Sequence, residues 1–545
     1  MSNFLITSLS PWIVSVALLT CFLIILIQLP QLIRFTLKLS LPVRIILMIV
    51  VIGGIFVRFG WVPNQHRIYF DEDRYLSGAV TFAKFNKSTL IDVATPQKLI
   101  MGDPDLVARI TVPTINGWVI KLFEDQEIYL FYAAKIMSVI QIILIFVAAY
   151  LFFKSLFIAT FGAVIFAFLP VNVFWSVSIG LDAYFVFFAL LAFVAACWYA
   201  KEPNVKSAIF LTASTLLLLF VRLESFLFLI VLFTTIFALR KIQHTPLFTK
   251  KDLKFLLFAT PFIGIRALVS ISVLGQTWCC GEATPLEAFS TGYFIRNTIP
   301  NLASLFKRPE FPFMLTILAI ISLFGKKDIR VIPFGLWTFF YFFIYSFYFA
   351  GLFFTLEYSG SYGRYLLMLV PPMTLLAGFS LESFVNSLKN SKSNNKSMFF
   401  LITIGMLLTL LPTVKNYRKM IDISPYDSYV DLGPRRVHEF LEKVIIPQTP
   451  DNAIIIHSLT STVLLHNKAT VYFGSFLYND TARTFVIDSL KRGVPTYMIQ
   501  TYTCETFADK CSEISGLVNL VTVPVDDPTM SGLELLKVEL KEGAN

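Results

Sequence analysis

The stretch YFDEDRY at residues 69–75 places three carboxylates beside a cation, directly after an apolar run. An ionised carboxylate at a membrane surface is a suitable general base or charge partner for a reaction there. The stretch therefore predicts catalytic carboxylates with neighbouring substrate-binding side chains, and its candidate residues are Asp71, Glu72, Asp73, Arg74 and Tyr75.

Apolar residues recur at helical spacing after this stretch, which predicts a helix that starts near Asp71 or Glu72. Asp71 would then be the N-cap, and Glu72 and Asp73 would lie in the first turn, where the helix dipole favours ionised acids. A well-capped helix is thus the alternative interpretation. It accounts for the acidic residues but not for Arg74 and Tyr75.

Two further stretches place charges at the edges of apolar runs. Asp182 lies in SIGLDAYF, and Arg222 and Glu224 interrupt LLFVRLESFLFL. Charges this close to hydrocarbon are costly and are usually paired or functional. The alternatives are an interfacial acid at Asp182 and a simple turn between two spans at Arg222.

The stretch EYSGSYGRYLLMLVPP places Arg364 between Tyr362 and Tyr365 at the start of an apolar run. A guanidinium group binds a phosphate with two parallel hydrogen bonds, whereas the alternative is an interfacial Arg and Tyr belt. Cations and an acidic cluster on one membrane face suit a lipid phosphate. The sequence contains no Gly-rich phosphate loop, so a nucleotide-sugar site is not expected.

The composition shows what must position these residues. The 545 residues are 56% hydrophobic and 15% charged, with a mean hydropathy of +0.71, so an integral membrane protein is expected. About twelve spans are predicted, at 11–30, 43–60, 129–151, 156–172, 183–200, 207–221, 224–240, 255–274, 311–324, 332–352, 365–385 and 398–414.

Lysine and arginine gather in alternate short loops, which predicts a cytoplasmic side for those loops. The net charge of +10 follows from this topology, and no nucleic-acid-binding motif accompanies it. We therefore predict an inner (plasma) membrane protein with a transmembrane domain at 1–414. Its outer loop at 61–128 and an α/β domain at 415–545 would be extracytoplasmic.

The tail supports an α/β assignment. AIIIHS and ATVYFG are short runs typical of buried strands, and GPRRVHEFLEKVI has helical spacing. Cys21 and Cys197 lie in spans and are interpreted as packing residues, while Cys279, Cys280, Cys504 and Cys511 are on the predicted outside, where disulfides persist. The five histidines are scattered without ligand spacing, which disfavours a histidine metal site.

The ordered set of these motifs resembles the GT-C superfamily of polyprenyl-phosphate-sugar glycosyltransferases, in the branch that holds protein O-mannosyltransferases and aminoarabinose transferases. The matching features are the acidic pair with Arg74-Tyr75, the series Pro170, Ser178 and Asp182, the Arg222-x-Glu224 motif, and the late series Arg364, Tyr365 and Pro371. The sequence departs from many members in having Pro113 alone where a Pro-Pro pair is usual, and in having two spans before the acidic loop.

The resemblance implies an inverting transfer from a polyprenyl-phosphate sugar to a protein, lipid or glycan acceptor. Asp71 would take the acceptor proton with support from Glu72, and Arg364 with Arg222 would hold the leaving phosphate. Some members use a divalent metal and others do not, so Mg²⁺ or Mn²⁺ at the DED stretch stays open. The other classes to weigh are a transporter or flippase of lipid-linked sugars, a glycan polymerase or ligase, and a non-catalytic scaffold with a sensory tail.

Overall fold

The computed structural model describes residues 5–102, 109–123, 126–274, 289–307, 311–325, 328–348, 364–389, 417, 434–500, 512, 514–525 and 533–541. The chain divides into two compact units, each described here by itself. The helical unit comprises Trp12–Gln65 and Phe131–Ser424, and the sheet unit comprises Met1–Pro11, His66–Leu130 and Pro425–Asn545.

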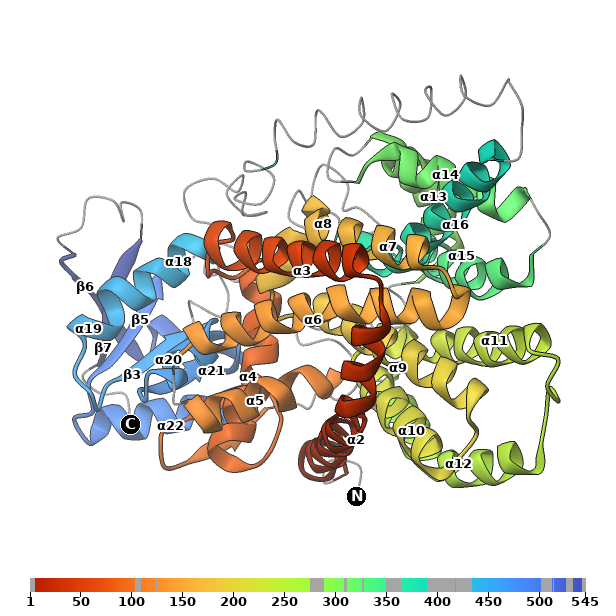
Figure 1. The fold of residues 1–545 in the computed structure, drawn as a ribbon. Coiled ribbons are helices and arrows are strands. Elements are labelled where there is room, and N and C mark those ends of the chain that lie inside the picture. Colours follow the sequence, from red (N-terminus) through yellow and green to blue (C-terminus); the bar gives the residue numbers. More distant parts are fainter. Residues whose placement is uncertain are drawn as a thin grey trace. The chain divides into compact units, whose positions relative to one another are not determined.

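The helical unit contains most of the long apolar helices (Figure 1). Its helices are α2 (Ser10–Lys38), α3 (Leu41–Phe56), η2 (Val57–Trp61), α6 (Ile128–Phe153), α7 (Leu156–Phe168), α8 (Pro170–Phe174), η4 (Trp175–Val177), α9 (Leu181–Lys201), α10 (Val205–Leu219), η5 (Leu223–Phe226), α11 (Leu227–Ile242), α12 (Lys250–Leu274), α13 (Thr291–Lys307), α14 (Phe313–Phe324), η6 (Ile329–Val331), α15 (Ile332–Phe347), η8 (Tyr365–Met368) and α16 (Val370–Lys389).

Among the described residues, seven helices are long and apolar enough to cross a membrane, or eight if the bent pair α7–α8 is one span. This confirms the multi-pass helical class. The predicted spans at 207–221 and 311–324 are the shorter apolar helices α10 and α14. The predicted span at 398–414, together with Cys279, Cys280, Cys504, Cys511 and Tyr362, lies outside the described residues.

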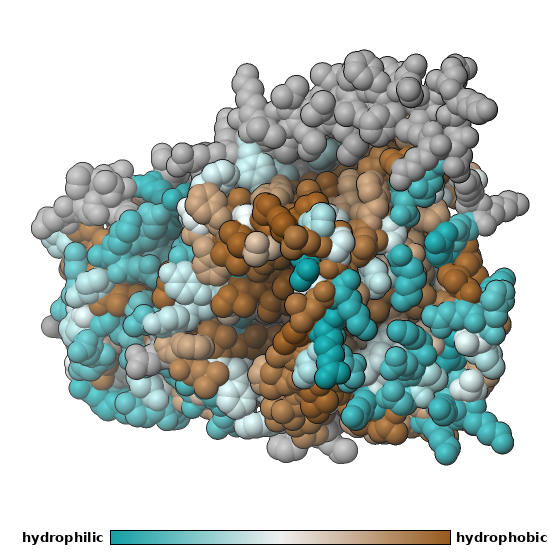
Figure 2. Space-filling model, in the orientation of Figure 1, coloured by the Kyte–Doolittle hydropathy of each residue, from teal (hydrophilic) through white to brown (hydrophobic). Residues whose placement is uncertain are grey.

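The surface of α2 and α3 shows why a bilayer is needed. Only 22% of the most apolar window of each helix is buried, and Figure 2 shows a broad hydrophobic surface over α3 and α2. Leu19 of α2 and Ile52 of α3 are both more than half exposed. Apolar area of this extent is stable against lipid but costly in water.

Arg58 lies buried inside the helical unit, at the break between α7 and α8. Pro170 has no N–H, so the carbonyl of Phe166 loses its helical donor. Buried Arg58 donates from Nη2 to Phe166 O at 3.0 Å and from Nη1 to Ala167 O at 2.8 Å, and Asn172 Nδ2 donates to Phe166 O at 3.1 Å. The cation therefore satisfies carbonyls that the 56° bend leaves without helical partners.

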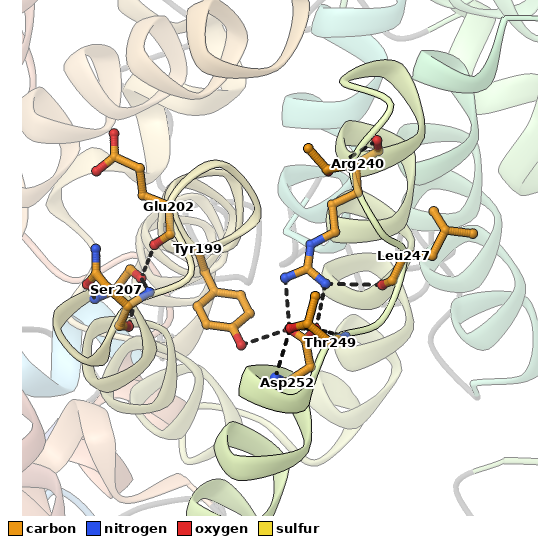
Figure 3. Close-up of polar contacts among 9 residues, drawn as sticks. Tyr199, Glu202, Ser207, Arg240, Leu247, Thr249 and Asp252 are labelled. Atoms are coloured by element: carbon orange, nitrogen blue, oxygen red, sulfur yellow. Dashed lines mark hydrogen bonds and ion pairs between the residues drawn. The ribbon is translucent and has the colours of Figure 1, made fainter.

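A second buried arginine connects the ends of three helices (Figure 3). Arg240 of α11 forms a bidentate pair with Asp252 of α12, at 2.8 Å from Nη1 to Oδ2 and 2.7 Å from Nη2 to Oδ1. Tyr199 of α9 donates to Asp252 Oδ1 at 2.8 Å, and the Thr249 N–H and hydroxyl donate to Oδ2. This Asp252 cluster fixes the basic loop between α11 and α12.

The sheet unit has a seven-stranded mixed sheet in the order β2-β1-β4-β3-β5-β7-β6. Its elements are η1 (Leu5–Leu9), α4 (Tyr69–Phe85), β1 (Ile91–Ala94), β2 (Leu99–Met101), α5 (Thr111–Phe123), α18 (Pro434–Phe440), η9 (Leu441–Ile445), α19 (Ile446–Gln448), β3 (Ile454–His457), α20 (Thr460–Leu465), β4 (Ala469–Tyr472), α21 (Phe473–Tyr478), α22 (Asp480–Lys491), β5 (Thr496–Gln500), β6 (Val518–Val523) and β7 (Glu534–Leu540).

The predicted strands AIIIHS and ATVYFG are confirmed as β3 and β4, which pair in parallel. Their buried residues, such as Ile456 and Val471, form one apolar core with the helices after β4. The predicted division assigned the loop at 61–128 to the membrane domain. The structure instead groups His66–Leu130 with the tail, because β1 pairs with β4 through Val93↔Val471 and Ala94↔Thr470.

Candidate active site

Asp182 is positioned by the turn that begins α9 in the helical unit. Gly180 is the N-cap of α9, and its N–H donates to Ser178 Oγ at 3.1 Å. Asp182 therefore lies in the first turn with its carboxylate held at the helix N-terminus, where the dipole favours negative charge. Its side chain is 1% exposed. All three residues of the predicted series, Pro170, Ser178 and Asp182, are buried.

Asp182 is shared between two arginines from distant parts of the chain. Arg222 donates from Nη1 to Asp182 Oδ1 at 2.7 Å, and Arg364 donates from Nε to Asp182 Oδ2 at 2.6 Å. Both guanidinium groups are buried. The structure therefore brings together three residues that the sequence predicted separately.

Glu224 and two tyrosines complete this group. Arg222 Nε donates to Glu224 Oε1, and the Tyr345 hydroxyl donates to the same oxygen at 2.6 Å. Tyr365 stacks on Tyr345 with ring centroids 4.5 Å apart. The guanidinium carbons of Arg222 and Arg364 lie 5.3 and 5.4 Å from the Tyr365 ring centroid, within cation–π range. We call these residues the Asp182 cluster: Asp182, Arg222, Glu224, Tyr345, Arg364 and Tyr365.

The Asp182 cluster is electrically balanced, with two carboxylates and two guanidinium groups. Buried ions need such pairing because an uncompensated charge in low dielectric costs several kcal/mol, on the order of 3–5 when one partner is removed. Each guanidinium carries five N–H donors in a planar fork. Two forks held side by side by one carboxylate are an arrangement that binds a phosphate through charge-assisted hydrogen bonds.

The acidic stretch lies in the sheet unit, on helix α4. The helix begins at Tyr69 with Ile68 as N-cap and no side-chain capping hydrogen bond, so Asp71 is not the N-cap that the sequence predicted. Asp71 and Glu72 instead occupy the first turn.

Glu72 pairs with His66, which precedes the helix. The Glu72 side chain is 1% exposed, and its Oε2 lies 2.8 Å from His66 Nδ1 and accepts from the Arg67 N–H at 3.3 Å. The other ring nitrogen, His66 Nε2, lies 2.7 Å from Glu127 Oε1. The imidazole of His66, shortly before α4, therefore lies between the carboxylates of Glu72 and Glu127.

The pKa values in this group follow from burial and pairing. Burial lowers the pKa of His66, but the charge of Glu127 and the hydrogen bonds to Glu127 and Glu72 outweigh it and raise that pKa well above its ordinary value. Burial raises the pKa of Glu127, but the His66 charge and hydrogen bond outweigh it and lower that pKa to about 2. Without a bound ion, this pairing favours the charged forms of both side chains.

The remaining residues of the stretch, Asp73, Arg74 and Tyr75, have different surroundings. Burial raises the pKa of Asp73 to about 7, and its backbone oxygen accepts from the Ser461 hydroxyl of α20 at 2.9 Å. Arg74 is half-buried. The Tyr75 hydroxyl is buried and accepts from Arg109 Nη1 at 2.9 Å. Because successive helical residues lie about 100° apart, the three acids do not converge on one point.

The sequence reading missed His66, Glu127 and His438, whose side-chain ligand atoms lie within 4.8 Å of one another. No local spacing links them, because His66 and Glu127 are 61 residues apart and His438 lies in the tail. The available signal was position alone: His66 is the nearest histidine before the acidic stretch, and Glu127 directly precedes α6.

No family model matches the chain, and no curated protein matches its sequence. Solved structures do match its fold. ArnT, an aminoarabinose transferase from Cupriavidus metallidurans, is similar when bound to undecaprenyl phosphate, with a TM-score of 0.54, 12% identity and coverage of 90% of this chain and 97% of ArnT. Apo ArnT gives a TM-score of 0.53 and 13% identity over the same shares.

The archaeal oligosaccharyltransferase AglB from Archaeoglobus fulgidus, in complex with an inhibitory peptide and a dolichol-phosphate, gives a TM-score of 0.48 at 11% identity, over 84% of this chain and 69% of AglB. The fold comparison rests on ArnT, which is matched over nearly its full length. The chain therefore shares the multi-pass helical fold of ArnT, with a C-terminal α/β region.

Proposed function

We propose that this protein is an integral-membrane glycosyltransferase that moves a sugar from a polyprenyl-phosphate donor to a protein, lipid or glycan acceptor. The observation that carries the proposal is the buried pair of arginines, Arg222 and Arg364, joined by Asp182. The similarity in fold to an ArnT bound to undecaprenyl phosphate supports a lipid phosphate as the ligand.

The two arginines would bind the phosphate that leaves with the lipid. Charge develops on that phosphate as the bond between the anomeric carbon and the phosphate oxygen breaks. Guanidinium donors already fixed by Asp182 would stabilise this charge without reorganising. A lipid phosphate leaves as a stable anion, so this half of the reaction needs no acid catalyst.

Asp71 is proposed as the base. Among the three neighbouring acids it is half-buried, whereas Glu72 and Asp73 are buried. Its carboxylate would take the proton from the acceptor hydroxyl as the acceptor oxygen bonds to the anomeric carbon. One displacement of this kind inverts the sugar configuration. Glu72 would support the base indirectly, because its own carboxylate fixes His66 at the start of the same segment.

The basic loops give the proposed orientation. The loop between α11 and α12 is flanked by Arg240, Lys241 and Lys250, and such loops remain in the cytoplasm. With that side fixed, the sheet unit and the acidic stretch would be extracytoplasmic, in a plasma (inner) membrane.

The test uses purified full-length protein in nanodiscs with a panel of radiolabelled polyprenyl-phosphate sugars and a membrane extract that supplies acceptors. We expect wild-type transfer from at least one donor, and a loss of about 10²–10⁴-fold in Asp71→Asn, which is the usual contribution of a general base. Asp480→Asn is the matched control, because Asp480 is also an acid in the first turn of a helix of the sheet unit.

Equal losses in Asp71→Asn and Asp480→Asn would contradict the role of Asp71. Absence of transfer and of binding for every donor would overturn the transferase proposal itself. If the wild type then moved a fluorescent polyprenyl-phosphate sugar between leaflets, the transporter class would replace it.

A further inference from the structure

The described residues contain one group of three side chains able to hold a metal ion, and it shares no residue with the Asp182 cluster. It is His66, Glu127 and His438, all within the sheet unit. His66 precedes α4, Glu127 precedes α6, and His438 lies on α18. Three separate segments therefore converge on one small volume.

The separations are those of a metal ligand set. Glu127 Oε1 lies 2.7 Å from His66 Nε2, and Glu127 Oε2 lies 3.6 Å from His438 Nε2. Ligand atoms bound to tetrahedral zinc at about 2.1 Å are about 3.4 Å apart. These two separations lie on either side of this value, and all three ligand atoms lie within 4.8 Å of one another, so side-chain rotations could bring them to one ion.

A second observation supports a metal ion at this site: the buried Nε2 of His438 lacks a hydrogen-bond partner among the described residues. The His438 side chain is 8% exposed. A buried nitrogen without a partner costs roughly 1–3 kcal/mol. The alternative arrangement without metal, a protonated His66 between two carboxylates, satisfies His66 but leaves His438 Nε2 in this state.

The surroundings orient the histidines as metal sites require. Glu72 Oε2 lies 2.8 Å from His66 Nδ1, so the carboxylate fixes this ring with Nε2 toward Glu127. A carboxylate behind a metal-bound histidine is the usual second layer of a zinc site. The ring of Tyr69 packs against both histidines, with centroids 5.1 Å from His66 and 5.2 Å from His438.

We propose that His66, Glu127 and His438 bind one divalent transition-metal ion of the zinc class. Two imidazoles and one carboxylate favour zinc, cobalt or nickel over magnesium and calcium, which prefer oxygen ligands. Half-exposed Glu442, whose Oε1 lies 4.0 Å from His438 Nε2, marks the side from which an ion enters. The bound ion would hold His66, Glu127 and α18 together, and this site stands independently of the proposed transferase reaction.

The experiment titrates Co²⁺ and Zn²⁺ into chelator-treated full-length protein in detergent. We expect one Co²⁺ per chain with visible absorption typical of a four-coordinate site, displacement by one Zn²⁺, and a higher melting temperature with Zn²⁺. His438→Asn and Glu127→Gln should each lower Zn²⁺ affinity by about 100-fold or more, since even outer partners are worth 10–100-fold. His244→Asn is the control, because exposed His244 follows α11 and lies in the helical unit.

X-ray absorption of the wild-type zinc complex keeps the proposal testable if a variant fails to fold. Two nitrogen ligands at about 2.0–2.1 Å are expected. Absence of stoichiometric Zn²⁺ binding, oxygen-only coordination, unchanged affinity in both folded ligand variants, or displacement of Zn²⁺ by millimolar Mg²⁺ would each overturn it. Because none of these readouts is sugar transfer, failure of the site and failure of the proposed function are distinguishable.

Discussion

The helical unit contains two buried arginine–aspartate clusters that divide their hydrogen bonds differently. In the Asp252 cluster, one arginine meets one aspartate through two bonds, and Tyr199 and Thr249 fill the remaining acceptor positions. In the Asp182 cluster, one aspartate gives a single oxygen to each of two arginines. The first cluster is closed on itself, whereas the second concentrates donors around one acceptor.

Under the proposed function, this difference would separate a structural ion pair from a phosphate-binding site. Arg240 also donates to the Leu247 carbonyl at 3.1 Å, so its donors are spent on neighbouring chain. The two arginines of the Asp182 cluster lie against the ring of Tyr365, and each contacts Asp182 through one nitrogen. If the proposed function is right, an incoming phosphate would meet two oriented cations in the second cluster, whereas Arg240 in the first is already bonded to Asp252 and Leu247.

The largest effect is expected in the closed cluster and should concern stability alone. Asp252→Asn leaves Arg240 buried without its counter-ion, so we expect a loss of about 3–5 kcal/mol in the free energy of unfolding. Thermal unfolding in detergent measures it, and transfer per folded molecule should stay unchanged. Lost transfer in the folded fraction would show that the Asp252 cluster also serves the reaction.

Arg364→Gln should weaken donor binding by about 10–150-fold, because a charge-assisted hydrogen bond contributes about 1.5–3 kcal/mol. Asp182 keeps its bond to Arg222 but loses its second counter-ion, so affinity is compared per folded molecule. Equilibrium binding of polyprenyl phosphate measures the effect. Arg330→Gln is the control, because Arg330 is paired with Asp328 at 2.7 Å in the same unit. Equal affinities for both variants would remove Arg364 from the phosphate site.

The smallest effects are expected when the hydroxyl group of Tyr345 or of Tyr199 is removed. Tyr345→Phe removes a hydrogen bond to Glu224, and Tyr199→Phe removes one to Asp252. Each should cost about 1 kcal/mol of stability. Only Tyr345→Phe should also change the affinity for polyprenyl phosphate, by a few-fold, since Glu224 then holds Arg222 less firmly. A matching affinity change in Tyr199→Phe would erase the distinction between the clusters.

The features that could be predicted from the sequence are those with a local pattern. Short apolar runs predicted β3 and β4, and long apolar runs predicted the membrane-spanning helices. The short strand Ile91–Ala94 was not predicted, because its 4 residues are too few for a clear pattern and it pairs with β2 and with β4 of the tail. Pairing across so long a separation has no local signal.

The site was predictable in part for the same reason. Asp182, Arg222, Glu224 and Arg364 were each visible as charges beside hydrocarbon, which is a local property. Their convergence on one carboxylate is a tertiary property and appears only in the fold. His66 and His438 show the converse case, since neither residue is unusual in its own neighbourhood and only packing brings their rings to 5.1 Å.

Arg58 has a consequence for how the chain is made. Its acceptors, Phe166 O and Ala167 O, are synthesised 108 and 109 residues later. During biogenesis, the segment that ends in Arg58 therefore enters the membrane machinery before these two acceptors exist, and an arginine in a membrane span is costly until it is paired. We expect truncated nascent chains that end before Pro170 to insert this segment less completely than longer chains, which glycosylation-site mapping of integration intermediates would reveal.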